Sequence, residues 1–258
     1  MTSLACALAG FDPVSLEALG PAQLLDRVDE KYVLPECMVP DVLEACRQAY
    51  RVLEVRHERR PGYLTVYFDT DDLRLYHAHH AGHVPRHKVR VRTYQVTGER
   101  FLEVKVRTNT GRTEKTRVLL APHATSLLAA LDGPAFPQLP SLTPARALHE
   151  TLDVAYTRIT LAARDAAERV TIDAGVAFAI PGKFASLDGM VVAEIKQQQH
   201  APSIFRDALR ACGVRPSRVS KYCLGVALLY PQAKQNNYKS ALARIRQLAT
   251  PFPEPTNA

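Results

Sequence analysis

The stretch RHKVRVRTY, residues 86–94, carries a cation at every second position: Arg86, Lys88, Arg90 and Arg92. Side chains of a β-strand alternate between its two faces, so we expect these cations on one face and Val89 and Val91 on the other. Like charges in such a row repel one another unless an anion lies among them. The stretch therefore predicts a strand with one cationic face, which in a single strand is more typical of the solvated side of an amphipathic sheet.

The same alternation recurs in segments 26–34, 101–107, 112–120, 168–173 and 190–197, where aliphatic residues take the opposite face. The residues that share a charged face are Arg27, Asp29 and Lys31; Glu103, Lys105 and Arg107; Lys115 and Arg117; Arg169, Thr171 and Asp173; and Glu194 and Lys196. Most of these sets include an acidic residue. The pattern predicts one continuous charged face that binds a polyanion together with a cation.

The order of the elements predicts the fold class. About nine period-two segments follow one another at short spacing, and helical stretches are inserted among them at 40–49, 71–80, 124–131, 143–152 and 203–212 and in the C-terminal part, 224–248. This order is typical of an antiparallel α+β domain, because a doubly wound parallel sheet needs a helix after every strand. We expect an antiparallel β-barrel tunnel of about eight strands, with a charged lumen and surrounding helices on its apolar outer face. An open sheet with a solvated charged face is the alternative.

The composition favours a folded protein with an anionic partner. The chain has 258 residues, of which 47% are hydrophobic, and a net charge of +7. Its five cysteines form no CxxC pair, which argues against a disulfide framework and a cysteine zinc site. The chain has no apolar run of about 18 residues, which is the length needed to span a bilayer, and no basic region typical of a secretory signal is evident. We expect a soluble, cytoplasmic protein with reduced thiols.

Eight motifs, taken in order, resemble the VTC domain, the polyphosphate polymerase module of the vacuolar transporter chaperone family within the CYTH-like triphosphate tunnel metalloenzymes. They are DEKY, VYFDTDDLRLYHAHHAG, RHKVRVRTY, FLEVKVRTNTGRTEKTRV, YTRITL, ERVTIDAG, VAEIK and SRVSKYCLG, within residues 26–227. The resemblance implies a tunnel that binds ATP phosphates and a divalent metal, Mn²⁺ or Mg²⁺. It also implies transfer of the γ-phosphoryl group to a growing polyphosphate chain with release of ADP. We expect a helical lead-in at 1–25, the tunnel domain at 26–230, and a C-terminal helix with a disordered tail at 231–258.

The resemblance also assigns roles to individual residues. The cations that match the phosphate-binding residues of the family and that we expect to be catalytic are Arg90, Arg92, Lys105, Arg158, Arg169 and Lys221. Substrate-binding residues are Lys31, Lys115 and the hydroxyl of Ser220 by resemblance, and Arg86, Lys88, Arg107 and Lys196 by strand parity. Glu194 matches the metal carboxylate, with Glu103 or Asp29 as additional ligands. The alternative is that Glu194 pairs with Lys196 or another lumen cation.

Two positions depart from the family pattern. Eukaryotic members have an arginine near the end of the helix where this chain offers His79 or His80, which would make that phosphate contact sensitive to pH. The wider superfamily begins with ExExK, whereas the same-face set here starts with Arg27, which weakens a metal-rich hydrolase interpretation. The cluster YHAHHAGH, residues 76–83, lacks a ligand-spaced partner, so solvated histidines are favoured over a zinc site there.

The sequence thus favours an ATP-dependent polyphosphate polymerase with ATP and polyphosphate as partners and no nucleic acid. The attacking phosphate oxygen is already ionised at neutral pH, so no Ser-His-Asp arrangement is needed, and none is evident. The alternatives are an inorganic triphosphatase or nucleotide cyclase on the same scaffold, or a non-catalytic polyphosphate or RNA binder.

Overall fold

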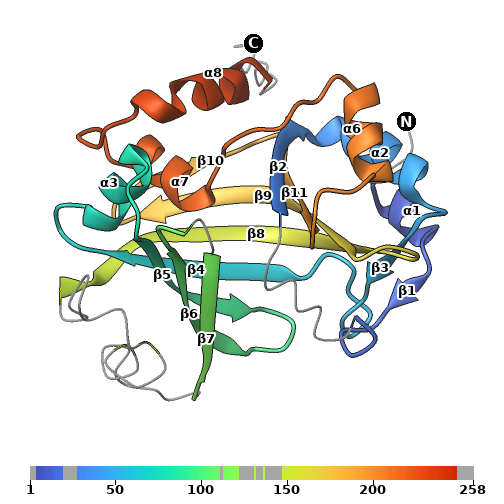
Figure 1. Ribbon diagram of the computed structural model, residues 1–258, viewed down its shortest axis with the longest axis horizontal. Coiled ribbons are helices and arrows are strands. Elements are labelled where there is room, and N and C mark those ends of the chain that lie inside the picture. Colours follow the sequence, from blue (N-terminus) through green and yellow to red (C-terminus); the bar gives the residue numbers. More distant parts are fainter. Residues whose placement is uncertain are drawn as a thin grey trace, which may run out of the picture.

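The computed structural model describes residues 4–19, 28–110, 113–121, 131, 136 and 147–248. These residues form an α+β fold on one eleven-stranded sheet (Figure 1). The eight strands of its main path, in spatial order, are β2 (Val28–Pro35), β11 (Met190–Gln197), β9 (Glu168–Ile180), β8 (His149–Ala163), β4 (Gly62–Asp69), β5 (Arg86–Tyr94), β6 (Arg100–Arg107) and β7 (Thr113–Leu120). Every neighbouring pair on this path is antiparallel. The predicted class is confirmed.

The sheet is curved but does not close within the described residues, where β2 and β7 are the two ends of its path. Its curvature brings distant strands together, because Lys105 Nζ on β6 lies 3.8 Å from Asp29 Oδ2 on β2. Three short strands lie off the path: β1 (Pro13–Val14), β3 (Tyr50–Leu53) and β10 (Lys183–Ser186). The tunnel fold is therefore present as an open, strongly curved sheet.

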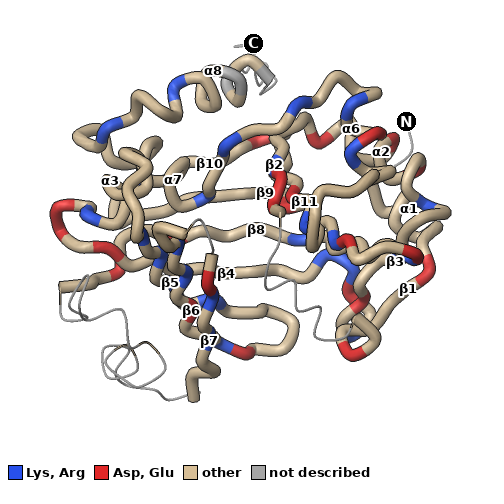
Figure 2. Tube along the Cα trace, viewed as in Figure 1, with Lys and Arg blue, Asp and Glu red and all other residues tan. Residues whose placement is uncertain are grey.

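The two faces of the sheet differ as strand parity predicts. Glu194 stands in register with Lys31 on one side and Thr171 on the other, and Arg158 stands opposite Asp173, so these side chains share a face. Figure 2 shows Lys and Arg gathered along β5, β6 and β7 with acidic residues among them. We call this charged concave face, together with the first residue of α7, the bore. Its charged residues are Asp29, Lys31, Arg86, Lys88, Arg90, Arg92, Glu103, Lys105, Arg107, Lys115, Arg117, Arg158, Arg169, Asp173, Glu194, Lys196 and Lys221.

Two groups of helices cover opposite ends of the sheet (Figure 1). Helices α1 (Leu4–Ala9), α2 (Val39–Cys46) and α6 (Ile204–Ala211) lie on the outer face of β2, β9 and β11, where their aliphatic residues form one core. At the other end lie α3 (Arg74–Ala81), α7 (Lys221–Leu229) and α8 (Lys239–Leu248). The short 3₁₀ turns η1 (Glu36–Met38) and η3 (Asn236–Tyr238) precede α2 and α8.

Helix α7 packs against the concave face, so the expectation that helices cover only the outer face is incomplete. Its residues share a core with Val33, Val192, Leu152 and Phe178. All nine residues of α7 are apolar apart from Lys221 and the Tyr222 hydroxyl, which allows burial on several sides. The helix thereby fills one end of the curved sheet and points its N-terminus, Ser220–Lys221, at the bore.

Two local predictions are corrected. A helix was expected at 143–152, but β8 begins at His149, because this segment pairs with β4 through Leu152 and Glu150. Tertiary pairing overrides the local helical pattern there. The lead-in is also not purely helical, since β1 pairs in parallel with β3.

The N-terminus of α3 is capped by an aspartate from the preceding strand. The Asp69 carboxylate, at the end of β4, accepts hydrogen bonds from the backbone N–H groups of Leu75 and Tyr76, both at 2.8 Å. Several predictions lie outside the described residues: the placement of Arg27, the helix at 124–131 apart from Leu131, and the tail from residue 249. Among the helices that are described, none is long and apolar enough to cross a bilayer.

Candidate functional site

Glu103, on β6, is the centre of the first charge cluster of the bore. Its carboxylate is 1% exposed and accepts from Arg90 Nε at 2.7 Å, from Lys115 Nζ, and lies 3.9 Å from Arg92 Nη1. Burial alone would raise the pKa of this carboxyl, but the three cations outweigh it and hold the pKa well below its ordinary value. Glu103 is therefore ionised and fully engaged by cations.

Asp173, on β9, holds a second cluster. Arg158 donates to both carboxylate oxygens, from Nε at 2.5 Å and from Nη2 at 2.8 Å, and Lys221 Nζ donates to Oδ2. Burial would raise the pKa of Asp173, but Arg158 and Lys221 lower it strongly. The first residue of α7 is thus tied to the sheet by an ion pair inside the bore.

Glu194, on β11, lies between two lysines. Lys31 Nζ is 2.8 Å from Oε1, and Lys196 Nζ is 2.9 Å from Oε2. Burial raises the pKa of Glu194, yet Lys196 and Lys31 lower it well below its usual range. The sequence left open whether this carboxylate binds a metal or pairs with Lys196 or another lumen cation, and here both of its oxygens face an ammonium group.

Burial disfavours the charged form of several lysines in the bore. Burial lowers the pKa of Lys105 and that of Lys115 to about 8 each, although acidic neighbours partly oppose the change. Lys196, which also donates to Thr171 Oγ1 at 3.2 Å, has a pKa lowered chiefly by burial. Cations also outnumber acids in the bore. An added polyanion would relieve this excess.

The N-terminus of α7 adds neutral donors to the bore. Ser220 is its N-cap residue, and Ser220 Oγ also accepts from Lys88 Nζ at 3.0 Å. Unpaired backbone N–H groups and the helix dipole make such an end favourable for a phosphate. Lys88, Ser220 and Lys221 are therefore brought together as the sequence predicted, although they lie more than 130 residues apart in the chain.

An aromatic surface that sequence reasoning missed supports the arginines. The rings of Tyr63 and Tyr156 are stacked, with centroids 5.3 Å apart, and the Arg158 guanidinium lies 5.3 and 5.2 Å from them. Tyr67 hydroxyl accepts from Arg90 at 3.0 Å. Such contacts fix guanidinium groups at low entropic cost. Only Tyr156 could have been found from the sequence, because it shares strand parity with Arg158, whereas Tyr63 and Tyr67 are placed on this face by the β4–β5 register.

Arg86 and His79, two residues predicted to contact phosphate, lie at the end of α3. Arg86 donates to the backbone oxygens of Gly82 and His83, at 3.2 and 3.1 Å, so it caps that helix. His79, rather than His80, contacts β5: its Nε2 lies 2.9 Å from the His87 oxygen, and burial followed by the charge of Lys88 lowers its pKa to about 2. His79 is therefore neutral at physiological pH, and the pH-sensitive contact is not expected from it.

The remaining predicted residues are placed as follows. Arg169 stands beside Lys196 in the β9–β11 register, on the concave face. Arg107 lies exposed at the end of β6, 3.4 Å from Thr113 Oγ1. His80 accepts from the Asn237 backbone at 3.5 Å and so contacts η3 rather than a metal. Within the described part of the chain no three Asp, Glu, His or Cys side chains are arranged to hold a metal ion.

Comparison with known proteins agrees with this geometry. The chain resembles the crystal structure of a putative adenylate cyclase from Bacillus halodurans, at 13% identity and a TM-score of 0.52, over 76% of this chain and 95% of that one. It also resembles a putative adenylyl cyclase from Hippeastrum, described as having a dominant triphosphatase activity, at 12% identity and a TM-score of 0.52, over 77% and 94% of the two chains. At these identities the likeness shows the fold alone.

No curated protein matches the sequence significantly. The model of the VTC domain, in contrast, matches residues 26–230, which is most of the chain and includes every charged residue of the bore. The curved antiparallel sheet, its cation-rich concave face and this match lead to one conclusion: the chain belongs to the VTC-domain family.

Proposed function

We propose that the chain is an ATP-dependent polyphosphate polymerase, which transfers the γ-phosphoryl group of ATP to the end of a polyphosphate chain and releases ADP. The observation that carries the proposal is that the acidic residues of the bore are ionised and paired with cations. Glu103, Asp173 and Glu194 are each held by at least two cations and have lowered pKa values. None is suited to take a proton from water, whereas an ionised phosphate acceptor needs no base.

The cations supply the rest of the chemistry. Arg90, Arg92 and Arg158 are positioned by acids and tyrosines, so their remaining N–H groups can grip phosphate oxygens in pairs. The lysines act as point charges along a polymer whose register changes at every addition. In this arrangement the bore aligns the acceptor with the γ-phosphate and stabilises charge on the transferred group and the leaving ADP.

A divalent cation fits the bore only if the protein and the substrate coordinate it together. Glu194 offers the hard oxygen donors that Mn²⁺ and Mg²⁺ prefer, and these ions are commonly held by one or two carboxylates plus phosphates. One of Lys31 and Lys196 would then pair with phosphate instead of Glu194. The ion would neutralise phosphate charge.

The test is to incubate the purified chain with ATP and Mn²⁺ and to measure polymer and ADP together. Long phosphate polymer in step with ADP supports the proposal. Arg90→Lys keeps the charge beside Glu103 but loses the paired grip, so turnover should fall roughly 10- to 100-fold. The matched control is Arg100→Lys, at an exposed position on the outward-facing parity of β6, which should change nothing.

A triphosphatase is the second candidate, because the Hippeastrum protein of similar fold is described as having that activity. Free phosphate from tripolyphosphate, without polymer from ATP, would replace the polymerase proposal with this one. Cyclic nucleotide and pyrophosphate would instead indicate a cyclase. Salt-sensitive tripolyphosphate binding without any turnover would indicate a binding protein.

A further inference from the structure

A cavity of about 460 Å³ lies outside the bore, on the opposite face of β2. Its walls are formed by α6, by the turn at Gly213–Pro216 and by Tyr32 and Glu30 of β2. Because Lys31 and Tyr32 are consecutive strand residues, Lys31 enters the bore while Tyr32 borders this outer cavity. A cavity of this size is typical of sites for small organic ligands.

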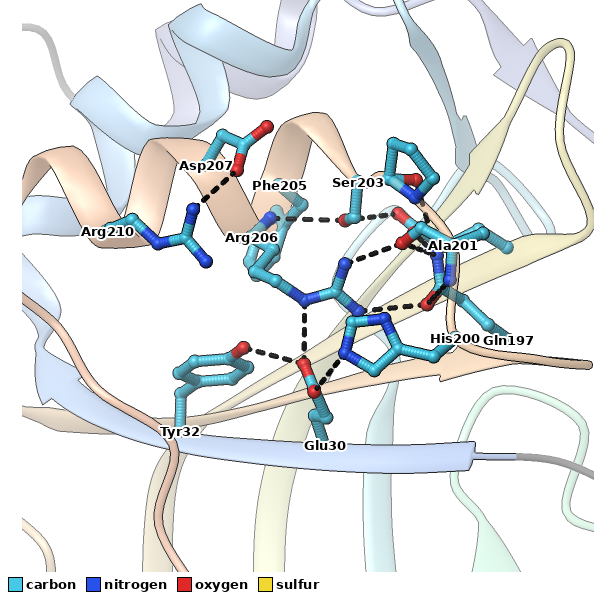
Figure 3. Close-up of polar contacts among 12 residues, drawn as sticks. Glu30, Tyr32, Gln197, His200, Ala201, Ser203, Phe205, Arg206, Asp207 and Arg210 are labelled. Carbon is cyan, nitrogen blue, oxygen red and sulfur yellow. Dashed lines mark hydrogen bonds and ion pairs between the residues drawn. The ribbon is translucent and has the colours of Figure 1, made fainter.

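The cavity is rich in arginine. Arg206 is fixed by Glu30 at 2.8 Å, by the Gln197 side-chain oxygen at 2.9 Å and by the backbone oxygen of Ala201 at 2.6 Å (Figure 3). Among the described residues Glu30 is the one acid lining the cavity, and its charge is already matched by Arg206; His200 Nε2 lies 3.3 Å from its other oxygen. The interior of the cavity therefore holds a preorganised guanidinium and no unmatched negative charge.

Two further arginines are not committed in this way. Arg210 has only a 3.6 Å contact with Asp207 on its own helix, with both side chains largely exposed (Figure 3). Arg215 is exposed and makes no hydrogen bond or ion pair with any described residue. The lining thus has a net positive charge. It also includes Val214 and Pro216, whose apolar surface an inorganic anion would not use.

The cavity is connected to the bore by a single short segment. Pro216 is bridged to Tyr32, and the backbone N–H of Ser217 donates to the oxygen of Lys31 at 2.7 Å. Three residues later the chain reaches Ser220 and Lys221, which contact Lys88 and Asp173 in the bore. A ligand that tightens the turn at 213–216 would therefore act on both Lys31 and the N-terminus of α7.

We propose that this outer cavity binds a small organic phosphate of nucleotide size, with its phosphate on Arg210 and Arg215 and its apolar part on Val214 and Pro216. The site goes beyond the proposed function and is separate from the bore. Occupancy of the cavity is coupled to the affinity of the bore for polyphosphate through residues 213–221. By linkage, each ligand changes the affinity of the other by the same factor.

The test is calorimetric titration of the full chain with AMP, in the presence of saturating tripolyphosphate to fill the bore. We expect one AMP per chain, and at least about tenfold weaker binding in Arg215→Glu, since a charge is reversed at the phosphate position. Arg210→Gln should weaken binding less. The control is Arg74→Glu, an exposed arginine on α3 at the other end of the sheet, which should bind AMP like the wild type.

Several outcomes would overturn the proposal. They are complete displacement of AMP by tripolyphosphate, equal binding by wild type and Arg215→Glu, or no binding at millimolar AMP. A second tripolyphosphate that is lost in Arg215→Glu would overturn the organic part of the assignment, and an unchanged tripolyphosphate affinity with AMP present would overturn the coupling. If tripolyphosphate alone does not bind, the proposed function fails, whereas Arg215-dependent AMP binding would still support the outer site.

Discussion

Arg158 donates hydrogen bonds to both carboxylate oxygens of Asp173, at 2.5 and 2.8 Å, on the inner face of the sheet. The pair lies beneath the N-terminus of α7, where Lys221 adds a second cation. This carboxylate therefore takes the place that a phosphate group could occupy between the two cations. The same relationship recurs at Glu103 and Glu194, so the bore is stabilised by internal counter-ions.

We expect Asp173→Asn to destabilise the protein and added polyanion to compensate. Removing the charge leaves Arg158 buried without its partner, which costs roughly 3 kcal/mol. Tripolyphosphate should then raise the melting temperature of the variant more than that of the wild type. Thermal unfolding without tripolyphosphate, with one equivalent and with an excess measures both effects. An equal ligand-induced shift in the two proteins would show that phosphate does not reach Arg158.

The affinity for polyanions should fall as the pH rises above about 8. Lys105 and Lys115 have pKa values lowered to about 8, so they lose their charges there, whereas the phosphates are already ionised. Calorimetry with tripolyphosphate from pH 7 to 9.5 measures this change. Replacing both lysines with arginine should flatten the profile, and a flat wild-type profile would contradict the prediction.

Protein stability should move in the opposite direction over the same range. The unfolded chain keeps these lysines protonated up to about 10.5, so between pH 8 and 10.5 it binds more protons than the folded chain. The contribution of both lysines to the free energy of unfolding therefore rises with pH across that window. Denaturant unfolding of the wild type against the double arginine variant isolates this contribution.

The faces of the strands could be predicted from the sequence because strand parity is a local property. Glu103 and Lys105 were placed on one face by their spacing alone, and the register confirms it. The packing of α7 on the concave face could not be predicted in this way, because an apolar helix does not indicate which surface it covers. Similarly, only the three-dimensional structure shows that His79 contacts β5 whereas His80 contacts η3.

The other predictions were wrong or missing because they depend on contacts between residues that are far apart in the sequence. The segment at 149–152 has a helical pattern, yet pairing with β4 on one side makes it a strand. The outer cavity combines Arg206 and Arg215 with Tyr32, which is more than 170 residues away, so no spacing rule could reveal it. Carboxylates at the bore were recognised as charged, but the pairing of Glu103, Asp173 and Glu194 with two or three cations each depends on how the strands are placed in the sheet.

Glu194→Gln should separate the two roles of this carboxylate. Without its negative charge, Lys31 and Lys196 are released, so metal-free tripolyphosphate should bind more tightly, by on the order of 1 kcal/mol. The stimulation of turnover by Mn²⁺ should be lost at the same time. Titrations and activity assays with and without Mn²⁺ measure the two effects, and retained Mn²⁺ stimulation would exclude Glu194 as the metal ligand.

Gly225→Ala should destabilise the protein and weaken the bore together. An added Cβ would lie 2.5 Å from Leu152 Cδ2 and 2.6 Å from Phe178 Cδ1, so these two buried side chains or α7 itself would have to move. A glycine-to-alanine change in a helix is otherwise stabilising by about 1 kcal/mol, whereas overpacking costs roughly 1–3 kcal/mol. The shift would also displace Ser220 and Lys221, which lowers tripolyphosphate affinity.

Denaturant unfolding and calorimetry of Gly225→Ala measure these two changes. Leu152→Ala removes the side chain that the new Cβ would meet, so the double variant should lose less stability than the sum of the two single changes. Part of the lost tripolyphosphate affinity should return with it, because α7 can settle back towards the sheet. A more stable Gly225→Ala protein would mean that α7 does not approach β8 this closely, and the N-terminus of the helix could then not be held at the bore by packing.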